Sequence, residues 1–254
     1  MTPEELAAVG LRYDVAGVVA TVTIARPEVR NAQTPAMWEA LAGIGDEIPD
    51  DVRVVVVRGQ GQSFSAGLDR GMLATLPELL SGSHDDVSGT IDRFQRGFTW
   101  LRDPRFVSVA VVQGHAIGAG FQLALSCDLR VLGDDALLCM KEPALGLVPD
   151  LTGTKPLVEA VGYARALEMC ATARTVGAAE ALEIGLATLV CPVADLDAAL
   201  ADLVGALTAP MAGAVRETKA LLAGAAGRSL DEQRRFEREA QIRRLDDLGS
   251  RTCR

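Results

Sequence analysis

The stretch QGHAIGAGFQLA, residues 113–124, decides the fold class of this chain. It predicts a buried strand that ends in a turn of small residues, with a helix beginning directly after the turn. The first N–H groups of a helix have no partner within the helix, so such a turn presents donors to whatever lies beyond it. A second turn of small residues, FSAGLD at 64–69, follows another predicted strand. Donors from two turns can converge on one oxygen, which is how backbone alone stabilises an enolate or a tetrahedral oxyanion.

The composition indicates a protein with a large core and no general affinity for anionic polymers. The 254 residues are 49% hydrophobic, which suits one α/β unit with an appendage. The net charge of −9 disfavours nucleic acid and anionic membrane surfaces as partners. Residues 1–6 are acidic and lack the apolar region of a signal peptide, and the apolar runs are too short to span a bilayer. We therefore expect a cytoplasmic protein.

The cysteines show neither a CxxC pair nor a histidine at metal-ligand spacing. The odd number of five, without a disulfide framework, predicts reduced and mostly buried thiols, and we expect no metal site. These residues are Cys127, Cys139, Cys170, Cys191 and Cys253.

Strand and helix patterns alternate in the first three quarters of the chain. A hairpin is predicted over 11–15 and 18–25, and Thr34 is placed to cap a helix with Pro35 at its first position, ending near Ile48. The β-branched run 52–58 predicts a strand covered on both faces. Further strands are expected over 106–112, 129–132 and 136–139, and further helices over 87–101 and 119–127.

The last part of the chain has a helical pattern. From about Thr152 onward the pattern is almost wholly helical, with Asp195 as the expected N-cap of a helix to Leu207. We therefore divide the chain into a core of residues 1–190 and a helical region of residues 191–254. The Arg/Glu run 234–244 predicts a solvated helix face with i,i+4 pairs. The polar segment Ser81–Ser88 is expected to be mobile, either as an acyl-chain lid or as simple disorder.

Four motifs together resemble the crotonase (enoyl-CoA hydratase/isomerase) superfamily. They are RPEVRNA at 26–32, SFSAGLD at 63–69, GHAIGAG at 114–120 and EPALGLVP at 142–149. The resemblance runs from about residue 10 to the C-terminus. It implies a crotonase-like (ClpP/crotonase) α/β fold, a spiral of ββα turns with a C-terminal helical trimerisation region, and a homotrimer or a dimer of trimers.

The resemblance also implies the ligand and the groups that bind it. The ligand is an acyl-CoA thioester, and no cofactor other than its CoA moiety is implied. The oxyanion hole falls on the backbone N–H groups of Leu68 and Ala119, where glycine is commoner at the second position. The CoA adenine is held largely by backbone at Ala66, Gly67, Leu68 and Asp69, with Arg26 or Arg30 near the phosphates.

The acidic residues favour one reaction of the superfamily over another. Members that hydrate enoyl-CoA use two glutamates; the later one is present as Glu142, but Gln122 stands at the position of the first. Glutamine orients water but carries no proton. A single carboxylate is enough for 1,3-proton transfer, so we expect a Δ3-to-Δ2 double-bond isomerisation with Glu142 as proton shuttle. Asp150 is expected to help, since its spacing from Glu142 is similar to that of the paired acids in dienoyl-CoA isomerases.

Two alternatives remain open at this point. One is an enoyl-CoA hydratase that uses Glu142 and a water oriented by Gln122; the other is a non-catalytic acyl-CoA-binding protein. Asp150 could instead cap a helix near Thr152. His115 is expected to be a packed core residue and His84 a solvent-exposed one. Neither Ser63 nor Ser65 stands in a GxSxG elbow. The acyl chain length is not encoded in any of these motifs.

Overall fold

The computed structural model describes residues 1–79 and 81–252. Its strands form a six-stranded sheet in the order β1-β2-β3-β4-β6-β9 and a three-stranded sheet in the order β5-β7-β8. The larger sheet consists of β1 (Leu11–Ala16), β2 (Val19–Ile24), β3 (Val54–Gly59), β4 (Val107–Val112), β6 (Leu129–Gly133) and β9 (Leu189–Cys191). The smaller consists of β5 (His115–Ile117), β7 (Leu137–Cys139) and β8 (Val176–Gly177).

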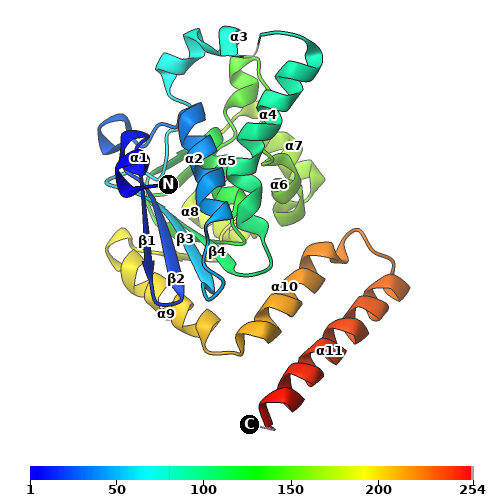
Figure 1. Ribbon diagram of the computed structural model, residues 1–254. Helices are drawn as coiled ribbons and strands as arrows, with labels where there is room; N and C mark the ends of the chain where they lie inside the picture. The colour runs from blue at the N-terminus through cyan, green and yellow to red at the C-terminus, as the bar shows by residue number, and fades with distance from the viewer. Residues whose placement is uncertain (80, 253–254) are drawn as a thin grey trace.

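Helices surround the two sheets and extend beyond them at the C-terminal end (Figure 1). The α-helices are α1 (Pro3–Ala8), α2 (Pro35–Asp46), α3 (Leu76–Leu79), α4 (His84–Thr99), α5 (Ala119–Ser126), α6 (Thr154–Val161), α7 (Tyr163–Thr172), α8 (Ala178–Glu183), α9 (Leu196–Thr208), α10 (Ala212–Ala225) and α11 (Leu230–Thr252). Short 3₁₀ helices are η1 (Pro27–Val29), η2 (Arg70–Ala74), η3 (Trp100–Arg102), η4 (Glu142–Leu145) and η5 (Val193–Asp195).

The larger sheet is covered on both faces, which explains its continuous valine runs. Only the β1–β2 hairpin is antiparallel, and the strands that follow are parallel. In β3, Val55 and Val57 pack into the main core, whereas Val54 and Val56 pack in a second cluster beneath α9. Successive side chains of a strand point to opposite faces, so a strand with two covered faces needs apolar residues at every position. The expected two-sided burial of this strand is confirmed.

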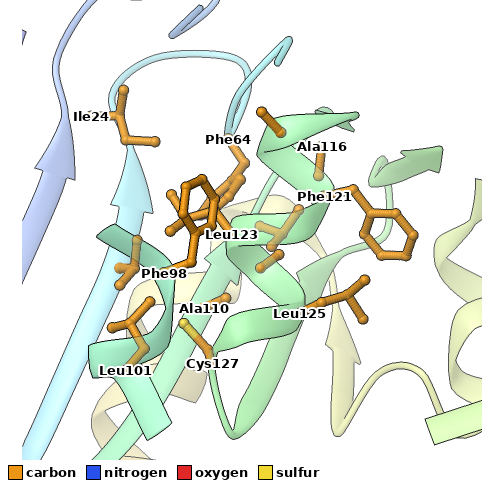
Figure 2. Packing of buried hydrophobic residues seen from close by; sticks show 14 of the residues in the cluster. Ile24, Phe64, Phe98, Leu101, Ala110, Ala116, Phe121, Leu123, Leu125 and Cys127 are labelled. Carbon is orange, nitrogen blue, oxygen red and sulfur yellow. The ribbon is translucent and has the colours of Figure 1, made fainter. Parts of the chain in front are cut away.

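Helix α5 passes through the centre of the main core. All eight of its residues are buried, because it is surrounded by the strands and by α4. Figure 2 shows Phe64 and Phe98 close to Leu123 on one side of α5, with Phe121 and Leu125 on the other. Apolar contacts on every side hold the helix in place, and the start of α5 is thereby placed firmly relative to the sheets.

Local signals predicted the longer strands and helices between residues 11 and 139. The hairpin is present, and the Thr34 hydroxyl caps α2 by accepting a hydrogen bond from the Met37 N–H at 3.3 Å, as expected. Helix α4 begins earlier than predicted, because Ser83 and Asp86 form a capping box. Part of the segment expected to be mobile is therefore an N-capped helix start.

The region after residue 152 is less uniformly helical than expected. The two short strands β8 and β9 pair with β7 and β6 respectively. Strands of two and three residues are too short to show a period-2 pattern. Asp195 does precede α9, but its side chain makes no capping hydrogen bond.

The C-terminal helices attach to the sheets in two different ways. Helix α9 packs Leu200, Leu203, Val204 and Leu207 beneath the larger sheet. Helix α10 buries no residue fully; it is held by Lys219, whose ammonium donates to the carbonyls of Asp103 and Phe106 and to the Asp128 carboxylate, each at 2.7 Å. Helix α11 lies beyond it, away from the sheets (Figure 1).

Helix α11 has the charged surface that its sequence predicted. It carries an i,i+4 ion pair between Arg235 and Glu239 at 3.9 Å and an i,i+3 pair between Asp231 and Arg234 at 3.2 Å. Among the described residues, no single helix is both long and apolar enough to cross a membrane; residues 193–208 and 212–225 meet the length and composition test only as a pair bent by 97°.

Candidate active site

The two turns of small residues lie side by side. Ser65 forms a parallel bridge with Ala116: its N–H donates to the His115 carbonyl at 2.8 Å, and its own carbonyl accepts from the Ile117 N–H at 3.0 Å. Gly67 has a φ of +88°, and a Cβ there would lie 2.5 Å from the Ile117 carbonyl oxygen. Only glycine permits this conformation and this close approach.

Two backbone donors are left unpaired where the turns meet. Within residues 1–79 and 81–252, neither the Leu68 N–H nor the Ala119 N–H forms a hydrogen bond. Ala119 is the first residue of α5, and its nitrogen lies 3.6 Å from the place where a Cβ on Gly67 would be. Leu68 is held between Gly67 and Asp69, which both hydrogen-bond to the Gln33 backbone. Two unpaired donors on adjoining turns are what an oxyanion hole requires.

Buried polar side chains to which we assigned no role from the sequence shape the first turn. The Ser65 hydroxyl donates to the Asn31 carbonyl at 2.8 Å and accepts from the Gly67 N–H at 3.2 Å and from Gln33 Nε2 at 3.0 Å. The Gln33 Oε1 in turn accepts from the indole N–H of Trp38 at 2.8 Å. A serine two residues before the glycine of the turn was the available signal, but its partners Gln33 and Asn31 lie 32 and 34 residues away in the sequence.

Glu142 places a carboxylate against the start of α5. Its Oε1 accepts from Gln122 Nε2 at 2.7 Å, and its Oε2 is buried without a hydrogen-bond partner. A Cβ on Gly118 would lie 3.1 Å from Oε1, so the carboxylate packs against the residue that precedes Ala119. Burial raises the pKa of Glu142 above its ordinary value, and the charge of Asp150 adds to the increase while the Gln122 hydrogen bond opposes it. A carboxylate with a raised pKa and one oxygen that accepts no hydrogen bond from the described residues is suited to proton transfer.

Gln122 is fully buried and has no acceptor capacity left. Its Oε1 accepts from the backbone N–H groups of Leu151 at 2.9 Å and Gly153 at 3.2 Å. A Cβ on Gly153 would lie 2.6 Å from the Gln122 Cγ, so the side chain fills the space that the glycine leaves. Gln122 therefore connects the Glu142 carboxylate to the turn at 151–153.

Asp150 directly precedes that turn and does not cap a helix. Helix α6 begins at Thr154 with Gly153 at the N-cap position, so the capping interpretation of Asp150 is wrong. Burial raises the pKa of Asp150, and its backbone carbonyl accepts from Gln95 Nε2 on α4 at 2.7 Å. The second acid is thus half-buried and electrostatically coupled to Glu142.

The two arginines expected near the CoA phosphates differ in their surroundings. Arg26 pairs with Asp69 at 3.0 Å and donates to the Ala32 carbonyl at 2.7 Å. The pKa of Asp69 is lowered chiefly by the Gly71 N–H, which donates to it, and further by Arg26. Arg30 is exposed, with a left-handed φ of 53°, and has no ion-pair partner within the described residues. Of the two, Arg30 is the guanidinium available to a ligand.

The remaining candidate groups lie outside this arrangement. His115 is half-buried, and its Nδ1 lies 3.2 Å from the Ser63 hydroxyl. Cys127 is a buried free thiol whose pKa burial raises to about 12, and Cys253 lies outside the described residues. In the part of the chain that the structure describes, no cluster of three or more metal-ligating side chains occurs.

Comparison with known proteins shows the family and the fold of the chain. The sequence profile of the enoyl-CoA hydratase/isomerase family matches residues 14–248. A solved Thermobifida fusca protein, assigned as an enoyl-CoA hydratase and in complex with acetoacetyl-CoA, is 51% identical, with a TM-score of 0.92 over 97% of this chain and 98% of that one.

One curated relative is named as a hydratase/isomerase and another as an isomerase. The Bacillus subtilis protein YngF, assigned as an enoyl-CoA hydratase/isomerase, is 34% identical over 79% of this chain and 76% of its own. The mitochondrial Δ(3,5)-Δ(2,4)-dienoyl-CoA isomerase of Rattus norvegicus is 33% identical over 83% of this chain and 67% of its own. With its two apposed turns and its α/β architecture, this chain belongs to the enoyl-CoA hydratase/isomerase family of the crotonase superfamily.

Proposed function

We propose that the protein is an enoyl-CoA isomerase that moves a double bond from Δ3 to Δ2, with Glu142 as the proton shuttle. The observation that carries this proposal is the difference between the Glu142 carboxyl group and the amide at position 122. Glu142 has one unpartnered oxygen, whereas the side chain at 122 is an amide whose carbonyl already accepts two backbone hydrogen bonds. One proton carrier at this place is sufficient for a 1,3-proton transfer.

In this mechanism, the thioester carbonyl oxygen accepts from the N–H groups of Leu68 and Ala119. Glu142 Oε2 removes a proton from C2, and the electron pair of that C–H bond forms a dienolate whose negative oxygen the two donors stabilise. The same oxygen then returns the proton to C4, and the double bond moves to C2–C3. No other reactant is consumed. Loss of one oxyanion donor costs about 2.7–4 kcal/mol in other enzymes, so the two turns supply a large part of the rate.

Asp150 is the second acid of the proposed site. Its half-buried side chain, its raised pKa and its electrostatic coupling to Glu142 support a role beside the Cα–Cγ region of the acyl group. Because a dienoyl-CoA isomerase is among the relatives, dienoyl-CoA isomerisation with both Glu142 and Asp150 is a second candidate function. For the CoA moiety we propose the backbone of Ala66, Gly67, Leu68 and Asp69 together with Arg30, Arg26 being engaged with Asp69.

A hydratase is the main competing function. It would need Gln122 to orient the attacking water, but the Gln122 carbonyl is occupied, and only its second amide hydrogen remains for a water. A non-catalytic acyl-CoA binder is the other alternative, and it would leave the unpartnered oxygen of Glu142 without a use.

The test is a paired assay on trans-3-hexenoyl-CoA and crotonyl-CoA, with products separated by chromatography. We expect conversion of the 3-enoyl substrate and little hydration of crotonyl-CoA. Glu142→Gln should lower isomerase kcat by about 10²- to 10⁴-fold, the usual contribution of general acid–base catalysis. Glu159→Gln, which removes an exposed carboxylate paired with Lys155, is the matched control and should be fully active.

Two results would contradict the isomerase. Faster hydration of crotonyl-CoA than isomerisation of the 3-enoyl substrate would make the protein a hydratase. Tight binding of both thioesters without turnover would make it a binding protein.

We also propose that the C-terminal region from residue 191 mediates formation of a homotrimer. Large apolar side chains of α10 and α11 are exposed in the single chain, and they are Leu222, Leu230, Ile242, Leu245 and Leu248. Sedimentation equilibrium would distinguish a trimer from a monomer.

A further inference from the structure

The amide of Gln122 lies between the two acids of the proposed reaction and contacts the segment that holds each. Its Nε2 donates to Glu142 Oε1 at 2.7 Å, and its Oε1 accepts from Leu151 and Gly153, which follow Asp150. The NH₂ group of this amide therefore contacts the segment that holds Glu142, and its carbonyl oxygen contacts the segment that follows Asp150. An ionised carboxylate at this position could not donate a hydrogen bond to Glu142.

The orientation of this amide is determined by its surroundings. Two backbone N–H groups require the carbonyl oxygen to face the turn at 151–153, so the NH₂ group must face Glu142. Thr152, between these donors, has a φ of 69°, which is unfavourable for a β-branched residue. The pair of hydrogen bonds to Gln122 helps to hold the turn in that conformation.

The donor on Oε1 makes the two oxygens of Glu142 chemically different. In a protonated carboxyl group the carbonyl oxygen is the better hydrogen-bond acceptor, so a donor at Oε1 favours carbonyl character there and places the proton on Oε2. Oε2 is buried and has no partner of its own. A proton held on it is kept away from exchange with water.

We propose that Gln122 is a positioning residue with two effects. It confines the transferred proton to Oε2 of Glu142, and it holds the turn at 151–153, directly after Asp150, in a fixed position relative to Glu142. This role rests on the isomerisation proposed above. The proton removed from C2 then returns to C4 from the same oxygen, without an exchange partner and without any further reactant. Gln122 itself never touches the substrate.

The electrostatic surroundings of Glu142 make the role measurable. The titratable groups coupled to Glu142 are Asp150, whose charge acts on it, and the thiols of Cys139 and Cys170, on which its own charge acts. The backbone of Lys141 also acts on Glu142, through a hydrogen bond that lowers its pKa. The Gln122 hydrogen bond stabilises the charged form of Glu142 against burial and Asp150. Removing this donor should therefore raise the pKa of Glu142 further.

The experiment compares the wild type with Gln122→Met, which keeps the length of the side chain and removes both amide contacts. The substrate is trans-3-hexenoyl-CoA carrying deuterium at C2, and deuterium at C4 of the product is measured by mass spectrometry. We expect the wild type to transfer part of the label to C4 and Gln122→Met to transfer much less. We also expect kcat to fall by about 10- to 100-fold, the equivalent of one hydrogen bond to a charged group, and the acid limb of the kcat/KM pH profile to move to higher pH.

Two further variants separate positioning from a general loss of stability. Gln95→Met removes another amide that contacts the Asp150 segment, at the Asp150 carbonyl, without touching Glu142, and should leave the acid limb unchanged. Gly153→Ala displaces Gln122, because its Cβ would lie 2.6 Å from Cγ, and should reproduce the direction of the Gln122→Met effect. Unchanged label transfer and an unchanged acid limb in Gln122→Met would overturn the proposal.

Failure of the proposed function would give a different result. A wild type that turns over no 3-enoyl-CoA would refute the isomerase itself. The positioning role would then be decided in the unliganded protein, by titrating the Glu142 carboxyl carbon with NMR. An equal pKa in the wild type and in Gln122→Met would refute it, and a higher pKa in the variant would support it.

Discussion

Replacing Ala119 by proline would remove one proposed oxyanion donor while keeping the helix that carries it. Ala119 is the first residue of α5, where an N–H has no partner within the helix and where proline is favoured. The preceding residue, Gly118, has φ 52° and ψ −120° and carries no Cβ, so it can precede a proline ring without a clash at that atom. The backbone at this position therefore accommodates proline, and the substitution removes one N–H group.

The size of the effect follows from the unpaired state of that N–H. It has no partner within residues 1–79 and 81–252, so its loss breaks no hydrogen bond of the protein. The cost falls on the transition state, where one missing oxyanion donor is worth about 2.7–4 kcal/mol, or roughly 10²- to 10³-fold in kcat. The proline Cδ would also occupy the position of the lost hydrogen, which can only add to this loss.

The assay is isomerase kcat on trans-3-hexenoyl-CoA, alongside the thermal midpoint of unfolding. Ala212→Pro is the matched control, because Ala212 is the first residue of α10 and lies in a different part of the chain from the two turns. We expect this control to be active and both variants to unfold near the wild-type temperature. A fully active, folded Ala119→Pro protein would refute the assignment of the Ala119 N–H to the oxyanion hole.

Three further predictions concern stability and the shape of the site. Because the pKa of Glu142 is raised in the folded state, the protein loses stability as the pH rises from the unfolded pKa of this group through its folded pKa. Glu142→Gln should therefore raise the melting temperature at pH 8 and not at pH 4. An equal difference between variant and wild type at both pH values would contradict the raised pKa. Gly67→Ala should abolish turnover and lower the free energy of unfolding by more than the roughly 1–2 kcal/mol that a left-handed conformation costs an L-residue, because its Cβ would lie 2.5 Å from the Ile117 carbonyl oxygen. Denaturant titration measures this loss. A variant as stable and as active as the wild type would show that the two turns are not packed this closely. Lys219→Met should destabilise the protein by about 1.5–3 kcal/mol, the value of a hydrogen bond to a charged group, because the half-buried Asp128 carboxylate would keep only its hydrogen bonds from Ser108. A urea midpoint equal to that of the wild type would show that α10 is not anchored there.

Much of the fold could be predicted because its signals are local. The valine run of β3 is apolar at every position because both of its faces are covered, and Thr34 with Pro35 marked the start of α2. The capping box at Ser83 was also readable from the sequence, but the polarity of the segment led us to expect mobility instead. The strands β8 and β9 had no such signal, because they are only two and three residues long and exist through their partners.

The candidate site was only partly predictable, as Gln122 illustrates. The sequence identified this residue by position and excluded it as a proton carrier. The three hydrogen bonds of its side-chain amide, however, join it to residues 20, 29 and 31 positions away. The same is true of Asp150, for which capping and catalytic interpretations were equally compatible with the sequence. The start of α6 at Thr154 decided against capping.

The amino-acid sequence was sufficient to predict the longer strands and helices before residue 152, the two glycine turns and the residue types available for chemistry, because these depend on backbone conformation and on side chains close in the chain. Three features required the folded structure: the turns that carry Leu68 and Ala119 lie side by side, Arg26 is engaged with Asp69, and Oε2 of Glu142 is buried without a partner among the described residues. Burial and partnership depend on which distant segments pack together, and no local pattern contains that information.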